Sequence, residues 1–126
     1  MAINVLVVGN DLHVHKLVVD ILEITFSDVT IEKATTAQAM IKKLGTKQYR
    51  YDLIVLDLQN SKKEDEVLIL NLRNKYPHLV SRLILLLDTI EEKPDDTILQ
   101  KIPFVVKPFS LDKFGELVRE VCSEKK

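Results

Sequence analysis

Short apolar segments alternate along the chain with longer segments in which apolar residues recur every three or four positions. The short segments predict five β-strands, at Ile3–Val8, Val29–Lys33, Leu53–Leu56, Leu83–Leu87 and Phe104–Val106. The first, third and fourth are almost continuously aliphatic, which is typical of strands that are covered on both faces of a parallel sheet. The second alternates apolar and polar residues, which indicates a strand nearer the edge of the sheet.

The amphipathic segments predict helices. They span Val14–Phe26, Thr36–Leu44, Glu66–Tyr76, Asp95–Lys101, which has room for only a short helix, and Leu111–Cys122. We expect Asp11 and Ser110 to act as N-caps, and Gly45 to lie at a helix C-cap. The alternation of strand and helix predicts an α/β fold, in which a doubly wound parallel sheet carries helices on both faces.

Length, charge, cysteine count and the length of apolar runs exclude several classes of protein. The chain has 126 residues, and we expect one domain over residues 1–122 with a loose tail at 123–126. Lys and Arg number 18 and Asp and Glu number 19, which excludes a general nucleic-acid binder acting by bulk attraction to phosphates. The single cysteine, Cys122, excludes a disulfide framework. No apolar run approaches the ~20 residues of a membrane span, and no signal region is visible, so we expect a cytoplasmic protein without membrane contact.

Chemically competent residues follow the predicted strands. In an open doubly wound sheet, ligands bind outside the carboxyl ends of the strands, so these positions are the ones to inspect. Asp57 ends the apolar third strand, and Lys107 ends the fifth. We expect the carboxylate and the ammonium to meet in one crevice. They form either a rim ion pair of small energetic value or an acceptor carboxylate with a fixed cation beside it.

Two segments carry a resemblance to a known family. Val55-Leu56-Asp57 and, about fifty residues later, Val105-Val106-Lys107-Pro108-Phe109 follow apolar strands. With the strand and helix alternation, nearly the whole chain resembles the receiver domains of two-component response regulators. The resemblance implies a flavodoxin-like (βα)5 fold with strand order 2-1-3-4-5. It also implies that Asp57 accepts a phosphoryl group, that Lys107 pairs with the phosphoryl oxygens, and that the bond before Pro108 is cis.

The resemblance further implies a Mg²⁺ cofactor, held by an acidic pair after the first strand, by Asp57 and by the backbone carbonyl of Gln59. Here the chain departs from the family, because the acidic pair aligns with Gly9 and Asn10, which carry no carboxylate. Asp11 is the nearest substitute ligand, although we expect it to cap the first helix instead. Metal binding is therefore expected to be weak or lost.

The switch positions depart as well. The family has Thr or Ser after the fourth strand, whereas the alignment places Asp88 there, and only a one-residue shift would bring the hydroxyl of Thr89 into its place. An ionised carboxylate cannot donate a hydrogen bond and would repel a phosphoryl oxygen. Phe104 stands at the position of the switch aromatic. The polar segment from Asn60 to Glu66, which contains neither Pro nor Gly, is expected to be a surface loop.

We therefore expect a receiver-type signalling domain that accepts a phosphoryl group on Asp57 from a histidine kinase or phosphotransfer protein. It would be at most self-phosphorylating and not a conventional enzyme. The alternative is a pseudo-receiver, a protein-interaction module independent of phosphorylation, in which Asp88 pairs with Lys107 and fixes one state. The family also implies a homodimer. A nucleotide- or flavin-binding enzyme is disfavoured, because Gly9-Asn10-Asp11 holds one glycine where such sites need several.

Overall fold

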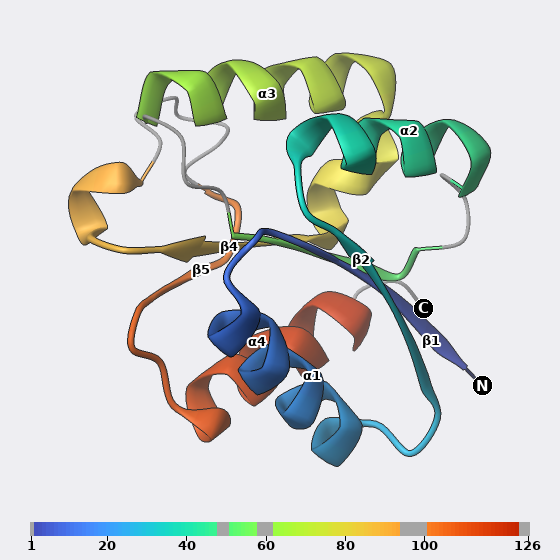
Figure 1. Cartoon of the computed structure of the whole chain (residues 1–126), viewed down its shortest axis with the longest axis vertical. Coiled ribbons are helices and arrows are strands. Elements are labelled where there is room, and N and C mark those ends of the chain that lie inside the picture. The colour runs from blue at the N-terminus through green and yellow to red at the C-terminus, as the bar shows by residue number, and fades with distance from the viewer. Residues whose placement is uncertain (1, 48–50, 58–61, 94–100, 124–126) are drawn as a thin grey trace.

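A computed structural model describes residues 2–47, 51–57, 62–93 and 101–123. Its strands are β1 (Ile3–Val8), β2 (Val29–Ala34), β3 (Leu53–Leu56), β4 (Leu83–Leu87) and β5 (Phe104–Val106). All neighbouring strands pair in parallel, in the order β2-β1-β3-β4-β5 (Figure 1). The predicted α/β class and the strand order implied by the resemblance are both confirmed.

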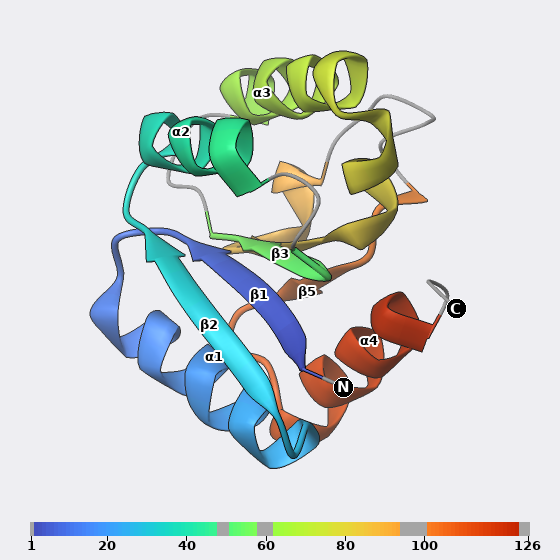
Figure 2. The same cartoon turned by 90° about the vertical axis from the view of Figure 1, so that its right-hand side faces the viewer.

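Helices cover both faces of this sheet. They are α1 (Leu12–Thr25), α2 (Ala37–Lys47), α3 (Lys62–Lys75) and α4 (Leu111–Ser123), with short 3₁₀ helices η1 (Pro77–Arg82) and η2 (Ile90–Glu92). Figures 1 and 2 show α1 and α4 on one face, and α2 and α3 on the other. Within the described residues, no helix is both long and apolar enough to cross a membrane.

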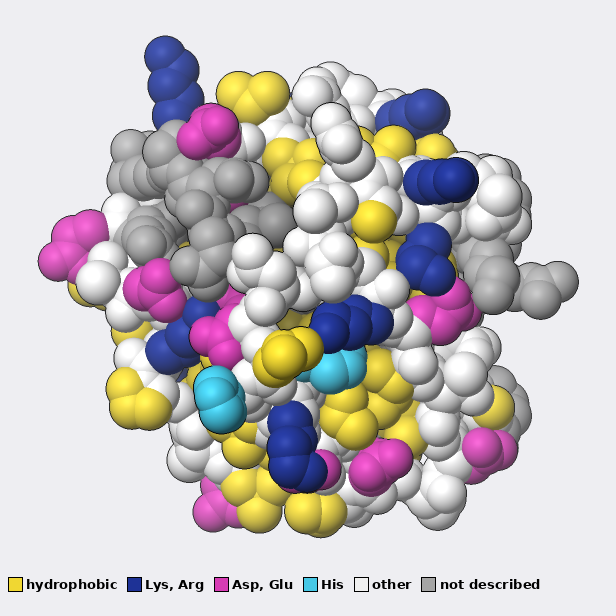
Figure 3. Space-filling view, in the orientation of Figure 1, with side chains coloured by type: hydrophobic (Ala, Val, Ile, Leu, Met, Phe, Trp, Pro, Cys, Tyr) yellow, Lys and Arg dark blue, Asp and Glu magenta, His cyan; other side chains and the backbone are white. Residues whose placement is uncertain are grey.

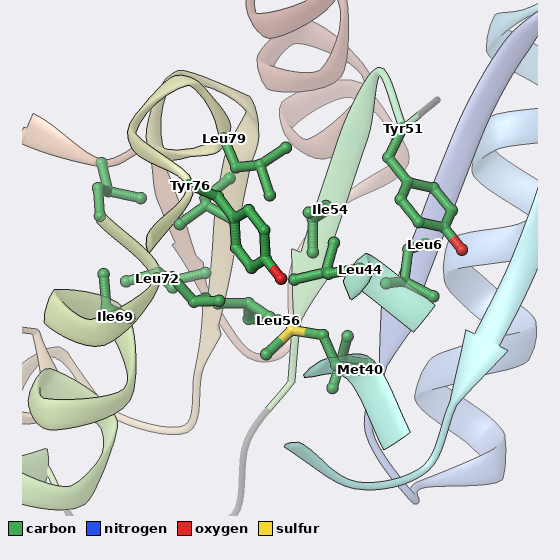
Figure 4. Packing of buried hydrophobic residues seen from close by; sticks show 14 of the residues in the cluster. Leu6, Met40, Leu44, Tyr51, Ile54, Leu56, Ile69, Leu72, Tyr76 and Leu79 are labelled. Carbon is green, nitrogen blue, oxygen red and sulfur yellow. The ribbon is translucent and has the colours of Figure 1, made fainter. Parts of the chain in front are cut away.

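The core has two halves, one on each face of the sheet. Alternate residues of a strand point to opposite faces, so Leu6 and Val8 join the cluster under α2 and α3, and Val5 and Val7 join the cluster under α1 and α4. Figure 4 shows the first cluster, where side chains of the helices pack over β3. Burial on both faces explains why the central strands are aliphatic at nearly every position.

Side-chain caps fix where helices begin. The Oδ1 atom of Asp11 accepts hydrogen bonds from the backbone N–H groups of His13 (2.9 Å) and Val14 (3.1 Å). Ser110 Oγ accepts one from the N–H of Lys113 at 3.0 Å. Both predicted N-caps are confirmed. Because the cap at Asp11 directly precedes Leu12, α1 begins two residues earlier than the apolar periodicity indicates.

Two predictions about helix ends are wrong. Gly45 does not end α2, because the helix continues to Lys47. The glycine lies on an exposed side of the helix, where nothing outside the helix is within 4 Å of a Cβ built on it. The expected surface loop before Glu66 is helical from Lys62 onward. The acidic residues Glu64 and Asp65 lie in the first turn, where the helix dipole favours negative charge.

Two further predictions concern segments that lie partly or wholly outside the described residues. The predicted helix Asp95–Lys101 lies outside the described residues except for Lys101. Ser123, assigned to the tail, is the last residue of α4, whereas residues 124–126 lie outside the described part. The 3₁₀ helix η1 was not predicted from the apolar pattern.

The substitution Phe114→Ala tests the core under α4. The Phe114 ring is fully buried and lies 5.2 Å, centroid to centroid, from the ring of Phe109. Because the truncation leaves a cavity, we expect the free energy of unfolding to fall by about 3–5 kcal/mol in urea denaturation. Leu111→Ala, an exposed position of the same helix, is the control and should cost less than about 1 kcal/mol. Equal losses in the two variants would contradict this packing.

Candidate functional site

The candidate site lies at the carboxyl edge of the sheet. The residues that directly follow β1, β3, β4 and β5 are Gly9, Asp57, Asp88 and Lys107. Backbone hydrogen bonds continue past the strand ends, since the N–H of Asp57 donates to the carbonyl of Val8 (2.7 Å) and that of Lys107 to the carbonyl of Leu87 (2.8 Å). The sheet itself therefore fixes the relative positions of the acid and the base.

Lys107 bridges two carboxylates. Its Nζ atom donates to Oδ1 of Asp57 at 2.5 Å and lies 3.2 Å from Oδ1 of Asp88. The side chain of Asp57 is 3% exposed, that of Lys107 18% and that of Asp88 51%. We call these three residues the charge cluster. The structure thus brings together the two residues predicted to do chemistry and the acid at the predicted switch position.

The charge cluster holds its protons tightly. Burial raises the pKa of Asp57 and outweighs the neighbouring Lys107 ammonium, which lowers it; the negative charges of Asp11 and Asp88 add to the rise. Burial alone would lower the pKa of Lys107, but its hydrogen bonds and ion pairs to Asp57 and Asp88 raise it overall. The two shifts thus have different main causes, which are burial for Asp57 and the two neighbouring carboxylates for Lys107.

Gly9 packs directly on Asp57. Its φ is +155°, and a Cβ atom at this position would lie 2.7 Å from the carbonyl oxygen of Asp57 and 3.0 Å from its Cβ. The N–H of Gly9 also donates to the carbonyl of Ala34 at 2.8 Å, which holds the backbone in place. Any side chain here, a carboxylate included, would force the ends of β1 and β3 apart. This contact was not among the sequence-based predictions, although a glycine immediately after an apolar strand is a signal of close backbone approach.

Comparison with known proteins identifies the fold. No family model matches the sequence, and no curated protein sequence matches it. Among solved structures, a response regulator from Thermotoga maritima is 22% identical with a TM-score of 0.78, over 98% of this chain and 99% of that one. The receiver domain of NtrX from Brucella abortus is 20% identical with a TM-score of 0.75, over 94% of this chain and 98% of that one. This chain has the receiver fold.

Two further solved structures agree. A CheY-like receiver domain from Methanospirillum hungatei is 18% identical with a TM-score of 0.76, over 99% of this chain and 97% of that one. A longer NtrX structure from Brucella abortus matches with 21% identity and a TM-score of 0.77, and there the chain spans only 27% of the matched protein's length. The chain thus matches only a part of the longer NtrX chain.

The described oxygen donors do not fit a magnesium site of the kind that receiver domains form. Asn10 is exposed and carries no charge, and the carboxylate of Asp11 is engaged in capping α1. Gln59, the predicted carbonyl ligand, lies outside the described residues. Over the ranges that the structure describes, no three His, Cys, Asp or Glu side chains are grouped closely enough to hold a metal. Asp57 is the one predicted ligand at the bottom of the site, and Lys107 already contacts it.

The structure also places the two remaining predicted switch residues, Thr89 and Phe104, and the predicted cis proline, Pro108. Thr89 is exposed and precedes η2, which it does not cap with its side chain. Phe104, in β5, has the Nζ atom of Lys93 4.9 Å from its ring centroid, a cation–π contact. The peptide bond between Lys107 and Pro108 is cis.

An apolar groove borders the charge cluster. The cavity, of about 480 Å³, is lined by His13, Val14, Leu17, Asp88, Lys107, Pro108 and Phe109. Its walls come from α1 and from the segment that connects β5 to α4. On α1, Leu12 is 69% exposed, and Figure 3 shows further hydrophobic side chains on the lower part of this face, with histidine and charged side chains between them. The receiver fold therefore presents an apolar surface beside its buried carboxylate.

Gly9→Ala tests the contact with Asp57. Because the added methyl group meets backbone atoms at a positive φ, we expect the free energy of unfolding to fall by about 2–4 kcal/mol, measured by urea denaturation. Gly45→Ala is the matched control. No atom outside the helix crowds that position in α2, so the substitution should stabilise the protein by about 0.5–1 kcal/mol. A neutral Gly9→Ala would show that the two strand ends are not in close contact.

The pH dependence of stability tests the electrostatics of Asp57. Its pKa is higher in the folded protein than in an unfolded chain, so the folded state binds the proton more tightly. The stability that this group contributes therefore falls as pH rises from about 4 through the folded-state pKa. We therefore expect the free energy of unfolding of Asp57→Asn, minus that of wild type, to be larger at pH 7.5 than at pH 4.5 in paired urea titrations. The opposite slope would mean that attraction to Lys107 outweighs burial.

Proposed function

We propose that this chain is a receiver-type interaction module of two-component signalling whose binding does not depend on phosphorylation of Asp57. The contact between Gly9 and Asp57 carries this proposal, because it closes the position at which a receiver holds the first metal-binding carboxylate. The receiver fold supports the signalling class, and the altered site supports independence from phosphorylation.

Charge around Asp57 supports the same conclusion. A phosphoryl group on an aspartate brings negative charge that must be neutralised during transfer and afterwards. In the charge cluster, one ammonium already faces two carboxylates at 2.5 and 3.2 Å. Asp88 stands where a hydroxyl donor would be needed, and an ionised carboxylate only accepts hydrogen bonds. The cluster therefore opposes the charge that phosphorylation would add.

The ion pair between Lys107 and Asp88 supplies a fixed state in place of a phosphorylation switch. Lys107 is held from below by Asp57 and from the surface by Asp88, so the ends of β3, β4 and β5 are tied together by side chains as well as by backbone hydrogen bonds. Such a module presents one surface continuously. Its regulation would then lie in partner abundance or in ligands.

The apolar groove beside the charge cluster suits a protein partner. Its apolar wall from Val14, Leu17 and Phe109 matches the apolar face of an amphipathic helix, and His13 and Asp88 give it a polar rim. A helix of a histidine kinase or phosphotransfer protein is the occupant that the receiver resemblance implies. The homodimer and the cytoplasmic location expected from the sequence stay predictions.

A second candidate function is phosphoryl acceptance with weak metal binding, and the pair of Asp57 and Lys107 favours it. In this reaction a carboxylate oxygen of Asp57 attacks the phosphorus of a phosphohistidine, the P–N bond breaks, and the histidine nitrogen takes up a proton. Lys107 would move from Asp88 to the phosphoryl oxygens. Bound Mg²⁺ would neutralise further charge, although the described donors do not provide its site.

Intact mass spectrometry separates the two functions. After incubation with acetyl phosphate, with and without Mg²⁺, we expect no phosphoryl adduct on the wild-type chain, because the developing charge has no second cation to neutralise it. Asp57→Asn gives the background for other acylation or phosphorylation sites. A Mg²⁺-dependent adduct on wild type that is absent from Asp57→Asn would overturn the proposal in favour of phosphoryl acceptance.

A double variant provides the gain-of-function control. Asn10 is exposed, so Asn10→Asp can add a carboxylate without steric conflict, and Asp88→Thr supplies the missing hydroxyl. We expect Asn10→Asp/Asp88→Thr to acquire an adduct that requires Mg²⁺, which shows that the assay detects phosphorylation on this fold. If both wild type and the double variant bind a partner helix equally well before phosphorylation, the interaction is independent of the altered residues.

A further inference from the structure

A second cavity lies at the opposite edge of the sheet from the charge cluster. Its volume is also about 480 Å³, and it is formed by the end of α3, by η1, by the residues that precede β5 and by the last turns of α4. The lining residues are Arg73, Pro77, Val80, Ser81, Lys101, Ile102, Pro103, Glu120 and Val121. Figure 2 shows α3 and α4 on opposite faces of the sheet, so the lining of this cavity comes from elements on both faces.

The walls of this cavity are mainly apolar. Ile102 and Val121 are almost fully buried, and Val80 and Pro103 are half-buried. Such walls accommodate a short hydrocarbon or aromatic group, and burying it would be favourable by the hydrophobic effect. The cavity alone does not define what kind of head group that ligand carries.

Arg73 supplies the head-group preference. Arg73 is one of the residues that line the cavity, and its Nη1 atom is buried and has no hydrogen-bond partner within the described part of the chain. A buried N–H without an acceptor is costly, and a carboxylate can accept two parallel hydrogen bonds from one guanidinium. Lys101 adds a second positive charge to the lining, against a single negative charge from Glu120.

We infer that this cavity binds a small amphipathic anion, a monocarboxylate with a short apolar tail. Its carboxylate would accept hydrogen bonds from Arg73, and its tail would lie between η1 and the end of α4, against Val80 and Val121. This inference does not rest on the proposed function, because the cavity shares no lining residue with the charge cluster. It holds whether or not Asp57 is phosphorylated.

Titration of the ¹⁵N-labelled chain with hexanoate tests the inference, with NMR chemical-shift changes as the readout. We expect the saturable shifts to concentrate around Arg73, Val80, Ile102 and Val121. Hexan-1-ol, which has the same apolar chain without the charge, should bind about tenfold more weakly, as expected when a charge-assisted hydrogen bond is lost.

Three charge variants sharpen the test. Arg73→Gln should weaken hexanoate binding about tenfold, and Glu120→Gln should strengthen it, because the exposed Glu120 carboxylate repels the ligand. Lys42→Gln removes one positive charge from the exposed surface of α2, which contributes no residue to the cavity lining, and should leave the dissociation constant unchanged.

Several results would overturn the site. They are no saturable binding of hexanoate, equal binding of hexan-1-ol, shifts centred on other residues, or equal effects of Arg73→Gln and Lys42→Gln. If Arg73→Gln alone loses the dispersed spectrum of a folded protein, the exposed Glu120→Gln variant still decides, since an unchanged affinity in that variant contradicts an anion beside Glu120. Failure here leaves the phosphorylation assay on Asp57 unaffected, so the two proposals fail separately.

Discussion

The backbone of Gly9 lies directly against Asp57, and the rest of the charge cluster follows from this contact. With no Cβ at position 9, the ends of β1 and β3 approach closely enough for Asp57 to be 3% exposed. A carboxylate in so little water needs a counter-charge, and Lys107 at the end of β5 supplies it. The same close approach removes the place where a side chain at position 9 would stand, so burial of Asp57 and the missing carboxylate at position 9 have one steric cause.

Charge balance then determines the role of Asp88. One ammonium beside one buried carboxylate is neutral, and the second carboxylate makes the cluster anionic. Burial is the main cause of the raised pKa of Asp57, to which the charge of Asp88 adds, and the two carboxylates together raise the pKa of Lys107. Asp88 is half exposed, so water screens part of its charge, and its pair with Lys107 costs less than a fully buried one would. The carboxylates of Asp57 and Asp88 are both paired with Lys107, and a further negative charge at Asp57 would be repelled by Asp88.

The two ends of the sheet have different characters. At the carboxyl edge, backbone hydrogen bonds and ion pairs hold a negative cluster under an apolar groove. At the other edge, an apolar cavity carries an excess of positive charge from Arg73 and Lys101. The short strand β5 connects them, since Ile102 and Pro103 line the cavity just before it and Lys107 follows it. A ligand at the cavity would therefore contact the segment that leads to the cluster lysine.

The sequence by itself determined the strand positions and the fold class, because a sheet buried on both faces requires continuous aliphatic strands, and this pattern is local. It also determined the N-caps at Asp11 and Ser110, which act on neighbouring residues. Helix ends were less predictable: Gly45 has the residue type of a C-cap, but its backbone remained helical. Only the tertiary structure decided that Lys107 bridges Asp57 and Asp88, that Gly9 excludes a side chain, and that Arg73 is among the residues that line a cavity. These contacts join residues from distant parts of the chain, and their distances depend on how the strands and helices pack.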